Sequence, residues 1–226
     1  MRLNETFDKK LWLIASIQFF GDILSFGVPT LMPSPVRSFG FDSVLTQLLT
    51  VPIFFVAVAI YIAVSFWSDR VQKRAVFMVP GALVVAIGYS MFCGISMKQR
   101  GVLYFACFLI VPGIYVMLGL NYVWMLNGHA GYYKRATAIE IDMTIGNCAG
   151  LVIGQIFKNT TPDGLYLEGI ATSPAVAMAC AVLITGLYFY KRRQNRVRDA
   201  LTPEERQAWI DQGKTGDAHL DFWFIL

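Results

Sequence analysis

Long apolar runs alternate with short polar linkers along most of the chain. Six runs are long enough to cross a hydrocarbon core of about 30 Å as helices, and they lie near residues 11–32, 44–67, 76–96, 102–125, 136–157 and 170–190. The linkers between them carry Pro, Gly, Asn or clustered charges, which are typical of turns. In lipid, only helices or closed barrels satisfy the backbone hydrogen bonds. The pattern therefore predicts an all-α membrane protein with six transmembrane helices in an antiparallel bundle.

The composition supports a membrane protein and excludes a soluble domain. Hydrophobic residues make up 56% of the 226 residues and charged residues only 15%, against about 25% charged in soluble domains. Five charged side chains lie in residues 1–10 and thirteen in residues 191–226, so the stretch between them is nearly uncharged. The four cysteines have neither CxxC spacing nor a histidine partner. We therefore predict no metal site and no cofactor.

Lys and Arg are divided unequally between the two sides of the predicted bundle. Thirteen lie on the side of the N-terminal segment and of the linkers after the second and fourth spans, and four on the other side. By the positive-inside rule, both ends of the chain are expected in the cytoplasm. The same rule explains the net charge of +4 without a nucleic-acid partner. The predicted organisation is a cytoplasmic segment at 1–10, the bundle at 11–190 and a cytoplasmic tail at 191–226.

The tail is predicted to contain one short helix. Thr202-Pro203-Glu204-Glu205 has the pattern of a capping box with proline in the first turn, which favours a helix near 203–211. The apolar end of the tail is too short to span a membrane. It either docks on the bundle or binds a partner, and we favour docking.

The first predicted span contains a carboxylate close to the middle of the membrane. Asp22 lies about 16 Å into this span at 1.5 Å per residue, and Gln18, Asp22 and Ser25 share one helical face. A carboxylate at this depth costs several kcal/mol and indicates a functional site. The polar face either makes a hydrogen bond between helices that fixes their packing, or lines a cavity in which Asp22 carries a proton. We favour the cavity.

The fourth and fifth spans supply further cavity candidates. Tyr115 and Asn121 lie in the fourth span, and Asn147 lies near the midplane of the fifth. Asn147 belongs to a polar stripe on the fifth span, about 120° away from the glycines at 146, 150 and 154. This GxxxGxxxG stripe predicts close helix packing.

Several residues near the predicted cytoplasmic surface have more ordinary interpretations. Glu140 and Asp142 lie one or two turns into the fifth span, where a gate or an ion pair is expected. Tyr122 and Trp124 fit the aromatic belt at a membrane interface. His129 follows Gly128 in a loop and is expected to be solvated.

The linker after the second span carries a recognisable motif. Residues 65–74 read SFWSDRVQKR, which resembles the GxxxDRxGRR/K loop motif of the major facilitator superfamily, with Ser65 and Gln72 where the motif has glycines. Residues 18–23, 48–52, 134–147 and 157–169, and the end of the tail, look like the fungal anion:cation symporter branch, which includes allantoate, nicotinate, pantothenate and biotin permeases. The resemblance covers nearly the whole chain and only the C-terminal six-helix half of that fold.

The resemblance implies a role and a missing partner. The superfamily fold has twelve helices in two halves, with the substrate between them at the midplane. By this likeness, the first and fourth spans line the cavity, and a plasma-membrane permease takes up a small organic anion with a proton. The cytoplasmic gate candidates are Asp69, Arg70, Lys73, Arg74 and Glu140. No Lys or Arg lies in the middle of a span, so the cation for the anion is expected in the N-terminal half or in a partner chain.

Two functional classes remain open. The first is the half of a permease, either as a piece of a longer chain or as a genuine half-protein. The second is a six-helix membrane protein that does not transport and serves as an interaction or regulatory partner. An enzyme is not predicted, because the sequence has no nucleophile with a matching base, no phosphate-binding loop and no HExxH motif.

Overall fold

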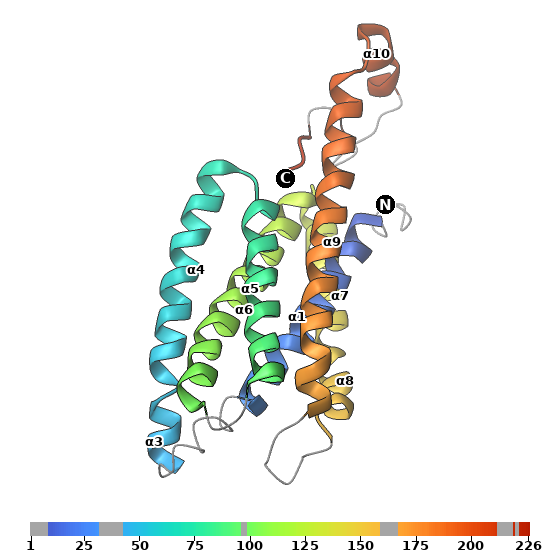
Figure 1. Ribbon diagram of the computed structural model, residues 1–226. Helices are drawn as coiled ribbons and strands as arrows, with labels where there is room; N and C mark the ends of the chain where they lie inside the picture. The colour runs from blue at the N-terminus through green and yellow to red at the C-terminus, as the bar shows by residue number, and fades with distance from the viewer. Residues whose placement is uncertain (1–8, 32–42, 96–98, 159–166, 212–218, 220–221) are drawn as a thin grey trace.

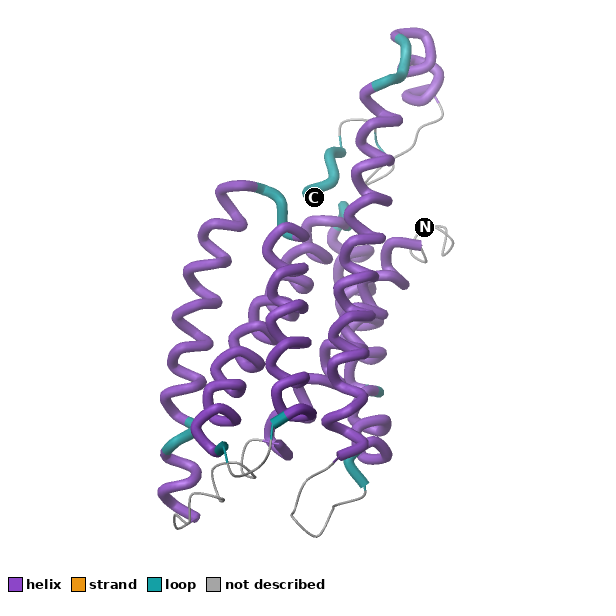
Figure 2. The backbone as a smooth tube through the Cα atoms, in the orientation of Figure 1, coloured by secondary structure: helices purple, strands orange, loops and turns teal. Residues whose placement is uncertain are grey.

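The computed structural model describes residues 9–31, 43–95, 99–158, 167–211, 219 and 222–226, and every regular element in these ranges is a helix (Figures 1 and 2). The helices are α1 (Lys9–Leu31), α3 (Ser43–Leu48), α4 (Val51–Val71), α5 (Ala75–Gly94), α6 (Arg100–Gly128), α7 (Tyr132–Asn147), α8 (Ala149–Ile156), α9 (Leu167–Asp199) and α10 (Pro203–Asp211).

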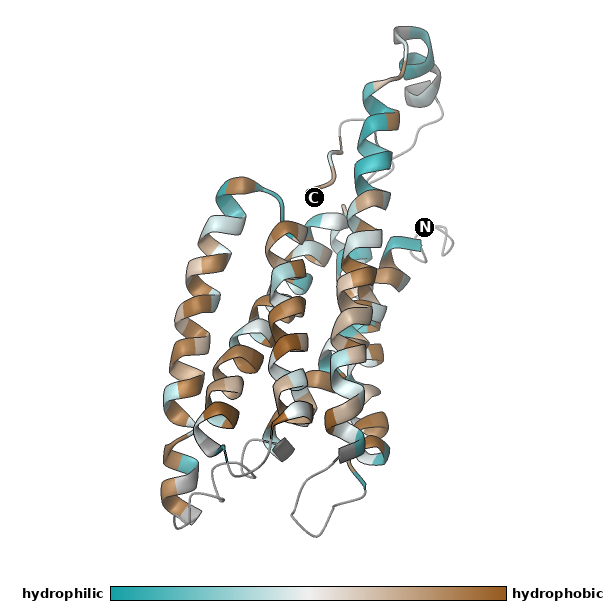
Figure 3. Cartoon of the chain, in the orientation of Figure 1, coloured by the Kyte–Doolittle hydropathy of each residue, from teal (hydrophilic) through white to brown (hydrophobic). Residues whose placement is uncertain are grey.

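Six helical stretches in the described residues are long and apolar enough to cross a membrane, with α7 and α8 together forming one of them. Figure 3 shows hydrophobic residues along the length of the bundle and hydrophilic residues where α9 extends beyond it. The predicted all-α, six-span architecture is confirmed.

Two of the predicted spans are interrupted. The second begins as the separate short helix α3, and α4 starts only after a turn at 49–50 with Pro52 in its first turn, where proline needs no intrahelical partner for its missing N–H. The fifth is divided at Cys148 into α7 and α8. Glycine has low helix propensity, and here Gly146 and Gly150 flank the break, next to Asn147, whose side-chain Nδ2 donates back to the Met143 carbonyl.

The last membrane helix is longer than predicted. The apolar run ends near residue 190, but α9 continues to Asp199. Lys191, Asn195 and Arg198 lie one helical turn apart on one face of this extension, and all three are buried. The helix therefore continues because this face has something to pack against.

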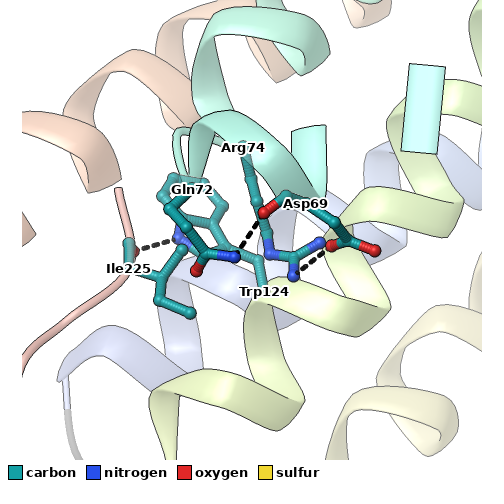
Figure 4. A network of polar contacts seen from close by, with 5 residues as sticks. All are labelled: Asp69, Gln72, Arg74, Trp124 and Ile225. Atoms are coloured by element: carbon teal, nitrogen blue, oxygen red, sulfur yellow. Dashed lines mark hydrogen bonds and ion pairs between the residues drawn. The ribbon is translucent and has the colours of Figure 1, made fainter. Parts of the chain in front are cut away.

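That contact is the end of the chain, residues 222–226, which docks on α9, α6 and the start of α5. Asn195 Nδ2 donates to the Phe224 carbonyl at 2.8 Å, and the Phe224 N–H donates to Asn195 Oδ1 at 3.2 Å. Trp124 Nε1 donates to the Ile225 carbonyl at 2.7 Å (Figure 4), and the Arg74 N–H donates to the Leu226 carbonyl. The docking that the sequence favoured is confirmed.

Helices α1, α5 and α6 make most of the contacts between helices in the described residues. α5 packs against α6 and α9, and α1 packs against α6, α7, α8 and α9, whereas α4 packs mainly on α6 at the edge of the bundle (Figure 1). The contact between α5 and α6 depends on glycine. A Cβ on Gly113 would lie 2.6 Å from Val85 Cγ2 and 2.9 Å from the Gly81 carbonyl oxygen, and one on Gly88 would lie 2.6 Å from Ile110 Cγ1. The two backbones therefore approach as closely as small residues allow.

Candidate functional site

A chain of polar side chains joins α1 to α6 inside the bundle. Gln18 Nε2 lies 3.1 Å from each carboxylate oxygen of Asp22, one turn further along α1. Gln18 Oε1 accepts a hydrogen bond of 3.0 Å from Asn121 Nδ2 on α6. Gln18 and Asn121 are buried, while Asp22 is half-buried. The predicted hydrogen bond between helices is therefore present, between α1 and α6. Asp22 is the last member of this series of polar side chains and the one that is accessible from outside.

Helix α7 approaches Asp22 through Gly146. A Cβ at this position would overlap Asp22 Oδ2 and lie 2.9 Å from Gln18 Cγ. Further along the stripe the contact loosens, because a Cβ on Gly150 would meet only Phe26 at 3.8 Å, and one on Gly154 would have nothing within 4 Å. Only the first glycine of the GxxxGxxxG pattern is needed for tight packing, since the other two have room for a side chain.

Asp142 lies one turn before Gly146 on the same face of α7, and it is wholly buried. Neither of its carboxylate oxygens has a hydrogen-bond partner, and its charged neighbour is Asp22. The ion pair expected at Asp142 is therefore wrong, while a role in a gate stays a prediction. The signal that could have located it was the i, i+4 spacing from Asp142 to Gly146, which puts the carboxyl on the packing face of α7 and not on its polar stripe.

The remaining cavity candidates do not join this chain. Ser25 is half-buried on α1. Tyr115 on α6 is 44% exposed and makes an edge contact with Phe54 of α4 at 6.4 Å between ring centroids. Asn147 is exposed, and its amide donates to the Met143 carbonyl of its own helix. Tyr115 and Asn147 therefore lie on outward faces of the bundle.

The loop motif forms a compact turn between α4 and α5. Arg74 Nη2 pairs with Asp69 Oδ1 at 2.9 Å, with the Arg74 side chain buried and that of Asp69 61% exposed (Figure 4). Gln72 ends α4 in the left-handed conformation, with φ of 56°, and its side chain donates to the Asp69 carbonyl at 2.5 Å. Glycine adopts this conformation with less strain, which fits the glycine that the motif has at this position.

The other gate candidates are solvent- or lipid-accessible. Arg70 lies over the Phe66 ring, 4.5 Å from its centroid. Lys73 and Glu140 are exposed. In this structure the pairing of Asp69 is with Arg74 of the same loop, so the residues available to contact another body are Arg70, Lys73 and Glu140.

Buried basic side chains gather at one end of the bundle, and we call this the basic end, defined by Lys10, Arg74 and Lys191. Lys191 Nζ lies over the Trp124 ring, 4.3 Å from its centroid. Trp124 is fully buried, so its predicted place in an aromatic belt is wrong. The belt pattern says only that an aromatic residue is near the interface, while the docked residue Ile225 supplies a buried partner for the indole N–H.

His129 also belongs to the basic end and is 1% exposed. The expectation that His129 is solvated is wrong, because its own side chain is buried although Gly131 in the same loop is exposed. Burial lowers the pKa of His129 to about 4, opposed by its hydrogen bond to the Met125 carbonyl and reinforced by Lys10, Lys134 and Lys191. The imidazole is therefore neutral at physiological pH.

The arrangement suits proton handling within the membrane more than bond-breaking chemistry. The described residues contain no group of three or more His, Cys, Asp or Glu that could hold a metal ion. The polar interior consists of two carboxyls, Asp22 and Asp142, beside the amides of Gln18 and Asn121. Such groups bind and release protons and hydrogen-bond a polar solute.

Relatives with curated names are transporters. The chain is 31% identical, over 97% of its length, to an uncharacterized transporter of Schizosaccharomyces pombe, of which it covers 43%. It is 33% identical, over 84% of its length, to the high-affinity nicotinic acid transporter of Saccharomyces cerevisiae, of which it covers 35%. It is 26% identical, over 87% of its length, to an MFS-type transporter of Hormonema carpetanum, of which it covers 40%.

These likenesses identify the chain as a homologue of transporters, including members of the major facilitator superfamily, and not of enzymes. The chain spans about two fifths of the length of the curated relatives it matches. No protein-family model matches the chain, and no solved structure matches it.

Proposed function

We propose that the chain forms the C-terminal half of a permease that carries a small organic anion together with a proton. The anion belongs to the carboxylate class that includes nicotinate and allantoate, and the membrane is the plasma membrane, with both ends of the chain in the cytoplasm. The observation that carries the proposal is the hydrogen-bonded chain from Asn121 through Gln18 to the half-buried carboxylate of Asp22. Intramembrane carboxylates of this kind serve proton relays in transporters.

The accessible polar residues of α6 and α7 support an incomplete cavity. Asn147 and Glu140 are exposed on α7, and Tyr115 is exposed on α6, at positions within the spans. Polar groups facing lipid are unfavourable, so these faces fit the wall of a site completed by another body. In transporters built from repeats, the substrate lies at the midplane between the two halves.

The relatives support the substrate class. One of them is named as a transporter of nicotinic acid, a carboxylic acid that is an anion near neutral pH. The spans of this chain contain no Lys or Arg at mid-depth, so the cation that pairs with the anion would come from the other half. We expect the chain alone not to transport, since one half presents only one wall of the site.

The test measures nicotinate uptake into proteoliposomes under an imposed proton gradient. The vesicles contain this chain, either alone or together with the N-terminal half of the yeast nicotinic acid transporter. Uptake that needs both halves supports the proposal. Saturable uptake by the chain alone contradicts the half-transporter, and no uptake in either preparation favours the alternative of a non-transporting interaction protein.

The role of Asp22 is tested in the same vesicles. In the Asp22→Asn variant the amide keeps the shape of the protonated acid but cannot release a proton. Accumulation against a gradient should be lost, while exchange at equal concentrations on both sides should continue. Asp199→Asn, an exposed acid at the end of α9, is the matched control and should behave as wild type. Unchanged accumulation with Asp22→Asn would return Asp22 to a packing role.

A further inference from the structure

We propose that Asp142 is a second proton-carrying carboxyl, which works as a pair with Asp22 across the contact between α7 and α1. This inference rests on the proposed function, because it names a further residue of the same proton pathway. It assigns to Asp142 a role in coupling, where the sequence pattern indicated only a gate or an ion pair.

The first observation is the isolation of the Asp142 carboxyl. Its side chain is 0% exposed, and both oxygens lack a hydrogen-bond partner. A charged carboxylate without a partner inside a membrane protein costs several kcal/mol. A neutral carboxylic acid in the same place costs much less. In this conformation Asp142 is therefore a protonated acid.

The second observation is the set of groups that face Asp142 from the helices packed against α7. Across the contact, α1 presents Asp22, with Gln18 bonded to it. From α6, the titratable neighbour is Tyr122, whose hydroxyl donates to Met143 Sδ at 2.6 Å. The described parts of α1, α6, α7 and α8 contain no Lys or Arg at this depth. Two neighbouring carboxyls without a cation between them hold at most one negative charge.

The third observation is the close approach that brings the pair together. Gly146 has no side chain to separate α7 from α1, and a Cβ there would overlap Asp22 Oδ2. Asp142 lies one turn along the same face, so any movement of α7 relative to α1 changes the distance between the two carboxyls. The glycine therefore makes the pair sensitive to the position of α7.

The two carboxyls differ in their access to water, and this difference decides which of them holds the proton. Asp22 is half-buried and Asp142 is fully buried. In the packed conformation the proton therefore stays on Asp142, and Asp22 carries the single negative charge of the pair. Separation of α7 from α1 would let water reach Asp142, so that its O–H bond breaks and the proton passes to water; a hydrated proton must form that O–H bond again before the two helices close. Proton release and helix movement are then linked by the same free energy.

The first test is infrared spectroscopy of the purified chain, which needs no transport activity. A protonated carboxylic acid has a C=O stretching band separate from that of a carboxylate, and the band shifts in D₂O. We expect such a band at neutral pH in the wild type, its loss in Asp142→Asn and its return in Asp142→Glu. Asp199→Asn, with an exposed side chain, should leave the band unchanged. A wild-type spectrum without the band, or a band that survives in Asp142→Asn, overturns the inference.

The second test uses proteoliposomes that contain both halves. Asp142→Asn should abolish nicotinate accumulation driven by the proton gradient and preserve exchange at equal concentrations. Proton-driven accumulation that continues in Asp142→Asn overturns the inference and leaves the proposed function intact. Absence of uptake by the wild-type assembly overturns the proposed function itself, and with it the transport role of the pair. The two failures are therefore distinguishable.

Discussion

Two of the helix contacts that depend on glycine differ in the chemistry of the side chains around them. Between α5 and α6, Gly113 lies against Val85 and the Gly81 carbonyl, and the surrounding side chains are apolar. Between α7 and α1, Gly146 lies against Asp22 and Gln18, with an unpartnered carboxyl at Asp142 one turn away. The first contact fills space with hydrocarbon, and the second brings ionisable groups together.

The difference separates stability from function. In the contact between α5 and α6, the atoms next to the glycine belong to the backbone and to a branched side chain, and these cannot move aside. The stabilisation that this contact gives therefore comes from close packing. In the contact between α7 and α1, the atoms next to the glycine belong to the polar side chains of Asp22 and Gln18, which can rotate. A glycine in the first contact therefore matters to the fold, and a glycine in the second matters to the placement of the carboxyls.

The largest effect is expected from overfilling the apolar contact. Gly113→Val would place methyl groups against Val85 and the Gly81 carbonyl, and it should lower the free energy of unfolding by about 3 kcal/mol, the upper end of the usual cost of overpacking. Gly186→Val on α9 is the matched control, because nothing lies within 4 Å of a Cβ there. Thermal unfolding in detergent micelles measures both. Equal stability of the two variants would show that α5 and α6 can move apart to accommodate a larger side chain at little cost in free energy.

Acid titration tests whether His129 makes the free energy of unfolding depend on pH. His129 has a pKa of about 4 in the folded chain against 6.5 when unperturbed, so the unfolded state binds more protons between these values. The contribution of His129 to the free energy of unfolding should therefore fall as the pH decreases from 6.5 towards 4, by up to about 3 kcal/mol. The carboxyl of Asp142, protonated in the folded chain and ionised in the unfolded chain, has the opposite effect, because the folded state then binds more protons and gains stability as the pH falls.

The matched variants are His129→Gln and His219→Gln, which replace the two histidines of the chain. Denaturant unfolding at a series of pH values should show that the free energy of unfolding of the wild type, relative to that of His129→Gln, falls as the pH decreases from 6.5 to 4. The profile of His219→Gln should follow that of the wild type. A difference between wild type and His129→Gln that does not change with pH would contradict the neutral, buried imidazole of His129.

The smallest effect on stability is expected at Gly146, together with a large effect on coupling. Gly146→Ala should cost only about 1 kcal/mol, because Asp22 and Gln18 can rotate away from the new methyl group. Their hydrogen bond would be broken, so proton-driven uptake by the assembled halves should be lost. Gly154→Ala is the control, since nothing lies within 4 Å of a Cβ there. Equal uptake by the two variants would contradict the special role of Gly146.

The sequence predicted which residues share a helical face better than it predicted which of them are buried between helices. The face shared by Gln18 and Asp22 follows from helical periodicity, and both residues do lie together, with Asn121 as their partner on α6. Asn147, chosen for its depth, points outwards, whereas Asp142, set aside as a gate residue, is buried. Periodicity tells which residues share a face, but a neighbouring helix decides which face is covered.

Residues brought together from distant parts of the chain could not be inferred from local pattern. The indole N–H of Trp124 donates a hydrogen bond to the carbonyl of Ile225, 101 positions further along the chain. His129 is buried near basic side chains from α1, α7 and α9. Each of these residues lies in a segment whose own sequence fits a membrane interface or an exposed loop. Their burial depends on the docking of residues 222–226 and on the packing of α9.

The sequence by itself determined the number of membrane spans and their helical type, because a run of about twenty apolar residues can satisfy its backbone in lipid only as a helix. It also determined the helical face of Asp22 and the helix at 203–211, since both depend on contacts within a few residues. Only the tertiary structure decided that Asp142 faces Asp22, that Gly146 is the single tight point of its stripe, and that α9 continues to Asp199. Those outcomes depend on which helix surfaces pack together. The free energy of such a contact depends on residues from two distant segments, so the pattern within one segment cannot reveal it.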